Sequence, residues 1–321
     1  MGPVVGIDVG GSGMRGRAVH GDRVLAELSW PGPVRISGAS LGSRVGELVR
    51  ALAADAESVA IGCAGVATFG AALSEPLAAA VPAPCVAVCS DLLTAYAGGL
   101  GLSADALLAD GGAGVVLAAG TGAVAFGGSS RTGWRRADGW GHLLGDDGGG
   151  AWIGRAGMNT ALRAADRRHG GSAVLLELLR ARVGEPSTVV AALTGRADRA
   201  GMLAAFAPAV IEAAGVDAAA AGVVRDAAAH LADTAAAVLD PGAAATVTAG
   251  SGEVAVTGGL VRPGGILAGL LEDALAARGL VVRRPAGTPL DGAVALAAAV
   301  ARGRLPAELA TAAALTVRPQ A

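Results

Sequence analysis

Three short glycine turns, each following an apolar run, have residue types and spacing that predict phosphate chemistry. Asp8 ends the first run and is followed by Gly10, Gly11 and Ser12. The other two turns are Gly120-Thr121-Gly122 and Gly258-Gly259. Residues without Cβ let backbone N–H groups approach a phosphate closely, and a carboxylate at a strand end can hold Mg²⁺ through water. The first two turns therefore predict a clamp for ATP phosphates with Asp8 as the Mg²⁺ residue, and Gly258 and Gly259 predict a surface for the nucleoside.

Each turn taken singly also fits an ordinary glycine β-turn, and Gly11 to Gly16 fits the spacing G-x-G-x-x-G. A dinucleotide-binding turn must open a helix, whereas residues 17–25 have the pattern of a β-hairpin around Gly21. Every basic residue is Arg, so a P-loop, which requires Lys, is excluded. These observations favour a strand–Asp–glycine turn–strand unit.

Asp91 is the candidate general base. It follows the predicted strand Val86 to Cys89, at the end where ligands gather in open α/β sheets. The alternative is an N-cap for a helix over residues 92–98, and both roles can coexist.

The elements that must position these residues alternate between strands and helices. Apolar patterns predict strands at 4–9, 58–63, 86–89, 114–119, 124–127, 254–257 and 280–282, and helices at 41–52, 71–80, 267–277 and 291–301. A glycine-rich loop with Trp134 and Trp140 is expected after residue 127, a mostly helical stretch over about 151–239, and a frayed tail over 316–321. The pattern restarts near residue 110, which predicts an α/β chain of two domains, 1–110 and 111–321.

Composition restricts the function classes. The 321 residues are 53% hydrophobic with a net charge of -2, so no footprint for nucleic acid is expected. The N-terminus lacks a signal-peptide pattern and no membrane span is predicted, which favours a cytoplasmic protein. The three cysteines, Cys63, Cys85 and Cys89, are expected to be reduced and buried.

In the order of its motifs, the chain resembles N-acetylglucosamine kinases within the BadF/BadG/BcrA/BcrD-type ATPase family of the actin-like superfamily. The resemblance rests on 6–12, Ser90-Asp91, 120–122, 257–260 and above all 139–150, which is similar to the family's W-G-H-x-x-G-D-E-G-S stretch. It implies two RNase H-like (actin-like ATPase) domains with a central interdomain cleft, and an ATP- and Mg²⁺-dependent kinase acting on the 6-hydroxyl of N-acetylglucosamine or glucosamine.

The resemblance also implies site residues. Asp91 would take the proton of the sugar hydroxyl, and the sugar would contact Gly139, Trp140, Gly141 and Asp146. Glycines 139, 141 and 145 allow close backbone approach, and the Asp146 carboxylate can accept from sugar hydroxyls. Trp140 either stacks on the sugar or belongs to a core or lid. His142 is expected to orient neighbours rather than act as a base.

Three positions depart from the family pattern. Ala123 stands where the family has Ser, and Asp147 and Gly149 replace its Glu and Ser. The family's sugar-contacting Asn has no counterpart between Val34 and Gly42, where Ser37 and Ser40 are the hydroxyls available. The resemblance therefore leaves the preferred sugar open.

Two other functions compete. An activator of 2-hydroxyacyl-CoA dehydratases has the same ATP fold but binds an iron–sulfur cluster between two subunits, for which Cys85 and Cys89 are the close pair. A non-catalytic sugar or nucleotide sensor is the second alternative, although it has little need of both Asp8 and Asp91. The expected partner is a small sugar, and a homodimer is left open.

Overall fold

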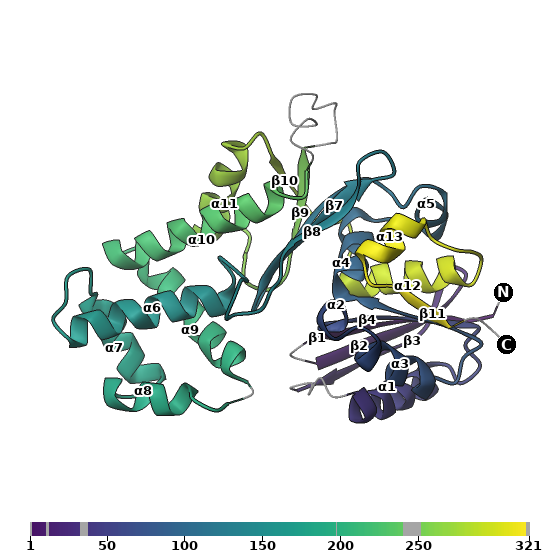
Figure 1. Cartoon of the computed structure of the whole chain (residues 1–321), viewed down its shortest axis with the longest axis horizontal. Helices are drawn as coiled ribbons and strands as arrows, with labels where there is room; N and C mark the ends of the chain where they lie inside the picture. Colours follow the sequence, from purple (N-terminus) through teal and green to yellow (C-terminus); the bar gives the residue numbers. More distant parts are fainter. Residues whose placement is uncertain (1, 11–12, 33–37, 197, 240–251, 319–321) are drawn as a thin grey trace. The chain divides into compact units, whose positions relative to one another are not determined.

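The protein forms two β-sheets with helices packed against them (Figure 1). The structure is a computed structural model and describes residues 2–10, 13–32, 38–196, 198–239 and 252–318. The predicted α/β class is confirmed. Contacts within the chain define two compact units: residues 1–116, 126–135 and 284–321 form the first, and 117–125 and 136–283 the second. The predicted domain boundary at residue 110 stays a prediction, because these units describe which segments pack together.

The first unit contains a sheet with the strand order β11-β5-β4-β1-β2-β3. Strands β1, β4 and β5 are parallel neighbours, so their carboxyl ends lie at one edge of the sheet. The hairpin predicted around Gly21 is confirmed as β2 and β3. The strands are β1 (Val4–Gly10), β2 (Gly13–His20), β3 (Arg23–Pro31), β4 (Ser58–Cys63), β5 (Cys85–Ser90) and β11 (Thr316–Arg318).

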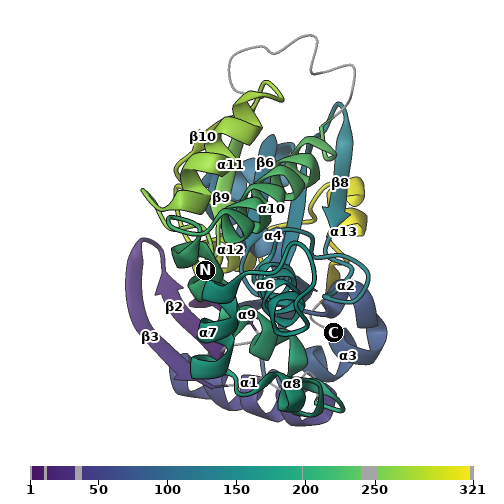
Figure 2. The ribbon, with the colours of Figure 1, turned by 90° about the vertical axis from the view of Figure 1, so that its left-hand side faces the viewer.

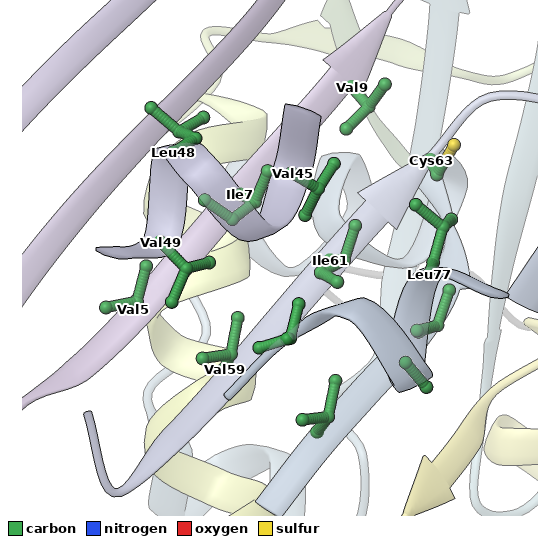
Figure 3. Close-up of a cluster of buried hydrophobic side chains, with 14 of the residues drawn as sticks. Val5, Ile7, Val9, Val45, Leu48, Val49, Val59, Ile61, Cys63 and Leu77 are labelled. Atoms are coloured by element: carbon green, nitrogen blue, oxygen red, sulfur yellow. The ribbon is translucent and has the colours of Figure 1, made fainter. Parts of the chain in front are cut away.

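Helices cover both faces of this sheet, which is why its parallel strands are apolar throughout rather than alternating. Val5, Ile7 and Val9 of β1 point to one face, where they form a core with helices α1 (Gly38–Leu52) and α3 (Ala71–Ala80) (Figure 3). Gly6 and Asp8 point to the other face, toward α4 (Asp91–Leu100) and α12 (Pro289–Val300). Asp8 is thus placed by the two-residue period of β1.

Glycines bring α4 and α12 together. A Cβ on Gly98 would overlap the carbonyl oxygen of Thr288, and a Cβ on Gly292 would overlap that of Thr94. Helix α12 begins with a capping box between Thr288 and Asp291, which fixes its start next to α4. Small residues at this contact thus set the position of the helix that carries Asp91.

The C-terminal residues were expected to be a frayed tail, and for the described part this is wrong. Residues 316–318 form β11, which pairs antiparallel with β5. The Arg318 guanidinium also donates to the carbonyl oxygens of Val81 and Ala83, at 2.9 and 3.1 Å. These contacts come from segments more than 200 residues away, so no local pattern predicts them. Short helices α2 (Val66–Phe69), α5 (Ala104–Ala109) and α13 (Ala307–Ala312) complete the first unit.

The second sheet has the order β10-β9-β6-β7-β8, and strands β6, β7 and β8 contribute residues to both units. The expected loop around Trp134 is wrong: Trp134 is buried in β8, and its indole N–H donates to the Tyr96 hydroxyl at 3.1 Å. The strands are β6 (Gly114–Ala119), β7 (Ala123–Ser129), β8 (Gly133–Asp138), β9 (Glu253–Thr257) and β10 (Val281–Arg283).

The helices of the second unit pack mainly on one another (Figure 2). They are α6 (Gly150–Ala165), α7 (Ala173–Arg182), α8 (Pro186–Leu193), α9 (Arg199–Ala213), α10 (Ala218–Ala236) and α11 (Ile266–Ala276). Among the described residues no single helix is long and apolar enough to span a membrane, and α9 and α10 satisfy the criteria only as a pair bent by 116°.

Candidate functional site

In the first unit, the predicted metal residue and the predicted base lie at the same edge of the sheet. Asp8 of β1 is in register with Gly62 of β4, and Gly62 with Cys89 of β5, two residues before Asp91. A Cβ on Gly62 would overlap the Thr94 side chain of α4. The missing side chain therefore lets α4 approach the strand ends, and its first residue, Asp91, comes close to Asp8.

Ser90, not Asp91, is the N-cap of α4. The Ser90 hydroxyl accepts from the Leu92 amide at 3.3 Å, and Asp91 is the first helical residue. The alternative that Asp91 serves as the N-cap is therefore wrong. The Thr94 hydroxyl donates to the Asp91 carbonyl at 2.9 Å, and the Ser90 hydroxyl lies 3.3 Å from the Asp91 carboxylate. The Asp91 carboxylate is thus free of the capping role, although it accepts from the Ser90 hydroxyl.

The electrostatics of this edge suit a general base. Burial, and next the negative charge of Asp8, raise the pKa of Asp91 to about 6, although hydrogen bonds from Ser90 and nearby amides oppose the shift. A carboxyl group with this pKa is ionised near neutral pH and binds a proton more readily than an ordinary Asp. Paired carboxylates of this kind are typical of catalytic sites.

Arg15 is a site residue that the sequence reasoning missed. It stands opposite Asp8 in the antiparallel pairing of β1 with β2, and its guanidinium is 2.6 Å from the Asp8 carboxylate. The Arg15 side chain is 49% exposed, whereas that of Asp8 is 12% exposed. The predicted strand–Asp–glycine turn–strand unit implied such a cross-strand neighbour, so the signal was the register of its two strands. The half-exposed Arg15 guanidinium can bind a phosphate in addition to the Asp8 carboxylate.

The first glycine turn is described only in part. Gly10 ends β1, and an added Cβ there would meet none of the described atoms within 4 Å. Gly11 and Ser12, predicted to contact phosphate, lie outside the described residues, as does Ser37. Ser40 is in the first turn of α1.

In the second unit, the other two glycine turns lie side by side. Gly258 has a φ of 101° and packs directly on Ala119, and the Leu260 amide donates to the Ala119 carbonyl at 3.2 Å. Ala119 precedes Gly120, so the predicted nucleoside and phosphate turns are neighbours. In the part of the chain that the structure describes, an added Cβ on Gly120 or Gly259 would meet no atom within 4 Å.

The start of α6 holds the phosphate turn in place. The amides of Gly150 and Ala151 donate to the carbonyls of Gly120 and Thr121, both at 2.8 Å. These are among the amides that a helix N-terminus leaves without partners inside the helix. The glycine-rich stretch and the Gly120-Thr121-Gly122 turn are thus joined through backbone hydrogen bonds.

Asp146 lies next to the same turn. A Cβ on Gly122 would overlap its carboxylate. Burial, and next the Asp138 charge, raise its pKa, although the amides of Ala123 and Gly141 and the charge of His142 lower it. The His142 Nε2 atom is buried and has no partner among the described residues. The influence of His142 on Asp146 places the two side chains near each other, and the orienting role of His142 stays a prediction.

Trp140 is 67% exposed, and the Arg136 guanidinium stacks 4.3 Å from the centre of its ring. Trp140 is therefore not part of the core of the second unit, so the alternative of a core residue is wrong there. Gly139 and Gly141, on either side, have φ values of 73° and 85°, which favour glycine. The loop presents an aromatic face and open backbone together.

Burial is the main influence on the pKa values of the three cysteines, and the Arg318 charge opposes it only at Cys85. All three are free, and Cys63 and Cys89 are fully buried. Burial, with the charges of Asp91 and Asp8, raises the pKa of Cys63 to about 12, and burial also raises those of Cys85 and Cys89. The expected burial is therefore found for Cys63 and Cys89, whereas Cys85 is only partly buried.

The structure therefore forms two groups of predicted residues. Asp8, Gly10 and Asp91 lie together in the first unit, and the turns 120–122 and 258–259 lie with 139–146 in the second. Comparison with family models gives a match to the BadF/BadG/BcrA/BcrD ATPase family over residues 5–297. The chain belongs to this family.

Solved structures agree with the BadF/BadG/BcrA/BcrD assignment. A candidate N-acetylglucosamine kinase from Chromobacterium violaceum is 26% identical with a TM-score of 0.66, over 92% of this chain and 98% of that one. One from Porphyromonas gingivalis is 16% identical with a TM-score of 0.66, over 92% and 97%. A ROK family glucokinase from Streptomyces griseus, in complex with glucose and AMPPNP, is 21% identical with a TM-score of 0.56, over 92% and 99%. The predicted actin-like fold class is confirmed. No curated protein matches the chain.

Proposed function

We propose that this BadF/BadG/BcrA/BcrD family member is an ATP- and Mg²⁺-dependent sugar kinase that phosphorylates the 6-hydroxyl of N-acetylglucosamine or glucosamine. The observation that carries the proposal is Asp91, at the start of α4 beside Asp8, with a pKa raised to about 6. A base that is ionised at neutral pH next to a second carboxylate suits deprotonation of an alcohol during phosphoryl transfer.

The chemistry assigns a distinct role to each group. Asp91 accepts the proton of the sugar hydroxyl while the hydroxyl oxygen of the sugar forms a bond to the γ-phosphorus. The bond between that phosphorus and the β–γ bridging oxygen breaks, which releases ADP. The glycine turns at Gly10, Gly120–Gly122 and Gly258–Gly259 contact the nucleotide, and the segment Gly139–Asp146 contacts the sugar. Positioning and charge neutralisation supply most of the rate in such reactions.

The residues present fit Mg²⁺ held largely by water and phosphate. Asp8 offers a carboxylate at a strand end, and Mg²⁺ in nucleotide sites commonly uses one or two carboxylates. Among the described residues there is no group of three or more His, Cys, Asp or Glu that could hold a metal. Bound Mg²⁺ would neutralise phosphate charge, and Arg15 would then share Asp8 with the metal or turn to a phosphate.

The amino-sugar assignment has its support in the 26% identical structure from Chromobacterium violaceum, described as a candidate N-acetylglucosamine kinase. The glycine-rich stretch adds chemical support because Asp146 and Trp140 offer a carboxylate and an exposed aromatic face in one loop. Sugars are recognised by such combinations of hydroxyl acceptors and aromatic surfaces.

The test is ADP release with ATP and Mg²⁺ over N-acetylglucosamine, glucosamine, N-acetylmannosamine and glucose, with mass spectrometry of the product. The variants are Asp91→Asn and, as a matched control in the same unit, Asp55→Asn, whose side chain is exposed. Turnover stimulated by an amino sugar, lost in Asp91→Asn and kept in Asp55→Asn, supports the proposal. No stimulation by any sugar, with ATP bound, refutes it.

The dehydratase-activator alternative is disfavoured by the cysteines. Ligation of an iron–sulfur cluster between subunits requires accessible thiolates, whereas Cys89 is fully buried and its pKa is raised. Purification without oxygen, followed by iron analysis and an absorption spectrum, decides this point: a stoichiometric cluster would favour the activator.

A further inference from the structure

The glycine-rich loop is fixed by Asp138, a residue with no role in the proposed chemistry so far. Asp138 is the last residue of β8 and has a φ of 60°, a conformation that Asp tolerates better than most residues. Its two carboxylate oxygens accept from two successive amides, Oδ1 from Asp146 at 2.7 Å and Oδ2 from Asp147 at 2.8 Å. One side chain therefore holds both acidic residues of the loop by their backbone.

The loop leaves space for this arrangement. A Cβ on Gly145 would overlap Asp138 Oδ1, so only glycine fits there without movement. Asp146 itself has a φ of 58°. Two non-glycine residues in left-handed conformation within one loop are costly, and they persist where local hydrogen bonds compensate.

The contacts continue from Asp146 to the phosphate turn. Its carboxylate lies against Gly122 and accepts from the amides of Ala123 and Gly141. The Gly139 amide in turn donates to the Ala123 carbonyl at 3.1 Å. An ionised carboxylate has about four acceptor positions, so about two remain after these backbone bonds. A sugar hydroxyl could use those positions as acceptors.

Asp138 is close to other negative charges. Asp138, Asp146 and Asp147 are three carboxylates within one loop, and the charge of Asp138 contributes to the raised pKa of Asp146. The basic side chains near the loop include His142, which lies close to Asp146, and Arg136, which stacks on Trp140. The Arg155 guanidinium donates to the His142 carbonyl at 3.5 Å. A neutral side chain at position 138 would avoid this repulsion, although it would offer the two amides fewer acceptors.

We propose that Asp138 is a positioning residue for sugar binding: by holding the amides of Asp146 and Asp147, it keeps the Asp146 carboxylate against the Gly122–Ala123 turn with acceptor positions free for a sugar hydroxyl. This inference rests on the proposed function. In this proposal Asp138, which lies outside the glycine-rich motif, determines the position of the Asp146 carboxylate inside it. The same contacts link the sugar loop to the phosphate turn.

The central variant is Asp138→Asn, which keeps the shape and the tolerance of left-handed φ but replaces one acceptor by an NH₂ donor. Asp138→Gly is the second variant, because glycine adopts this φ without strain while removing both acceptors. Asp226→Asn is the matched control, since Asp226 is an exposed residue of α10 in the same unit. Each is assayed for the KM of the sugar, the KM of ATP, kcat and amide hydrogen exchange in residues 139–150.

Loss of hydrogen bonds to a charged group predicts a fall of about tenfold to a hundredfold in kcat/KM for the sugar in both Asp138 variants. The KM of ATP should change by less than about twofold, and exchange at the Asp146 and Asp147 amides should become faster without any ligand. If Asp138 acts through Asp146, then in an Asp146→Asn background Asp138→Asn should lower kcat/KM by less than about twofold more.

If the Asp138 variants have the same kinetics with the sugar as Asp226→Asn, the inference is overturned while the proposed kinase function stands. The same holds if Asp138→Asn has an equal effect in the wild-type and Asp146→Asn backgrounds. Equal losses for sugar and ATP would also overturn it, because they would indicate a general structural role. A wild-type protein that phosphorylates no sugar would refute the proposed function, and the inference with it.

Discussion

Replacement of Asp91 by Asn should have two opposite effects: a loss of catalytic activity and a gain in the stability of the folded protein. The side chain keeps its size and its position at the start of α4, but it no longer ionises and no longer accepts a proton. Phosphoryl transfer to a sugar should therefore fall by about a hundredfold or more, since general base catalysis contributes about that much. The folded protein should at the same time become more stable at neutral and alkaline pH.

The size of the stabilisation follows from the pKa of Asp91. A pKa raised from 3.8 to about 6 means that the charged form is disfavoured in the folded state, chiefly by burial and next by Asp8. This difference corresponds to at most about 3 kcal/mol. The cost is absent below pH 3.8, grows as the pH rises toward 6, and is complete above about pH 7. An Asn at this position avoids the cost at every pH.

The assay is urea unfolding of wild type and Asp91→Asn at pH 5 and pH 8, followed by circular dichroism. Effects of Asn that do not depend on pH cancel between the two conditions. The difference in free energy of unfolding, variant minus wild type, should increase by about 1 to 2 kcal/mol from pH 5 to pH 8. A difference that stays constant, or that decreases as the pH rises, would refute the assignment of a raised pKa to Asp91.

Three further predictions follow from other contacts of the first unit. In the wild type, kcat/KM for the sugar should fall as the pH drops through about 6. Asp8→Asn removes the charge that helps to raise the pKa of Asp91, so the acidic limb of the remaining activity should move to lower pH. An acidic limb that stays in place in the pH–rate profile would contradict the coupling between Asp8 and Asp91. Gly98→Ala should destabilise the protein by about 3 kcal/mol or more in chemical unfolding, because the new Cβ would overlap a backbone carbonyl at the start of α12. The control is Gly222→Ala, whose Cβ would meet none of the described atoms within 4 Å and which should be neutral or stabilise the protein by about 0.5 to 1 kcal/mol. Equal effects of the two variants would count against the close approach of α4 and α12. Cys63, whose pKa is raised to about 12, should resist alkylation by iodoacetamide at pH 8 in the folded protein and react after unfolding, as peptide mass mapping can show; rapid labelling of the folded protein would show that the thiol is accessible.

Local patterns in the sequence determined much of this protein because they depend on near neighbours alone. The strands at Val4–Gly10, Ser58–Cys63 and Gly114–Ala119 follow from short apolar runs that end at glycine or polar residues. The hairpin after Gly10 excluded a dinucleotide-binding helix, and the order of the glycine turns indicated the family to which the chain belongs. Asp8 and Asp91 were identified in the same way, since Asp8 lies near the end of a buried strand and Asp91 directly follows one.

Tertiary structure decided whatever depends on segments distant in the chain. The pairing of β11 with β5 joins residues more than 200 positions apart, and the apparent tail at Thr316 had no local signal of its own. The pKa of Asp91 is raised by burial and next by Asp8, which comes close because strands β1, β4 and β5 are parallel neighbours and Gly62 admits α4. Burial and charge act through space, so neither can be deduced from spacing along the chain.

The same reason applies to Arg15 and Asp138. Arg15 reaches Asp8 through the register of a hairpin, and Asp138 reaches the amides of Asp146 and Asp147 through a turn of the glycine-rich loop. The sequence by itself determined the types of residue available for phosphate, metal and sugar. The tertiary structure decided which of their atoms already have partners, because hydrogen bonds and ion pairs are made between atoms that folding brings within about 3 Å of each other.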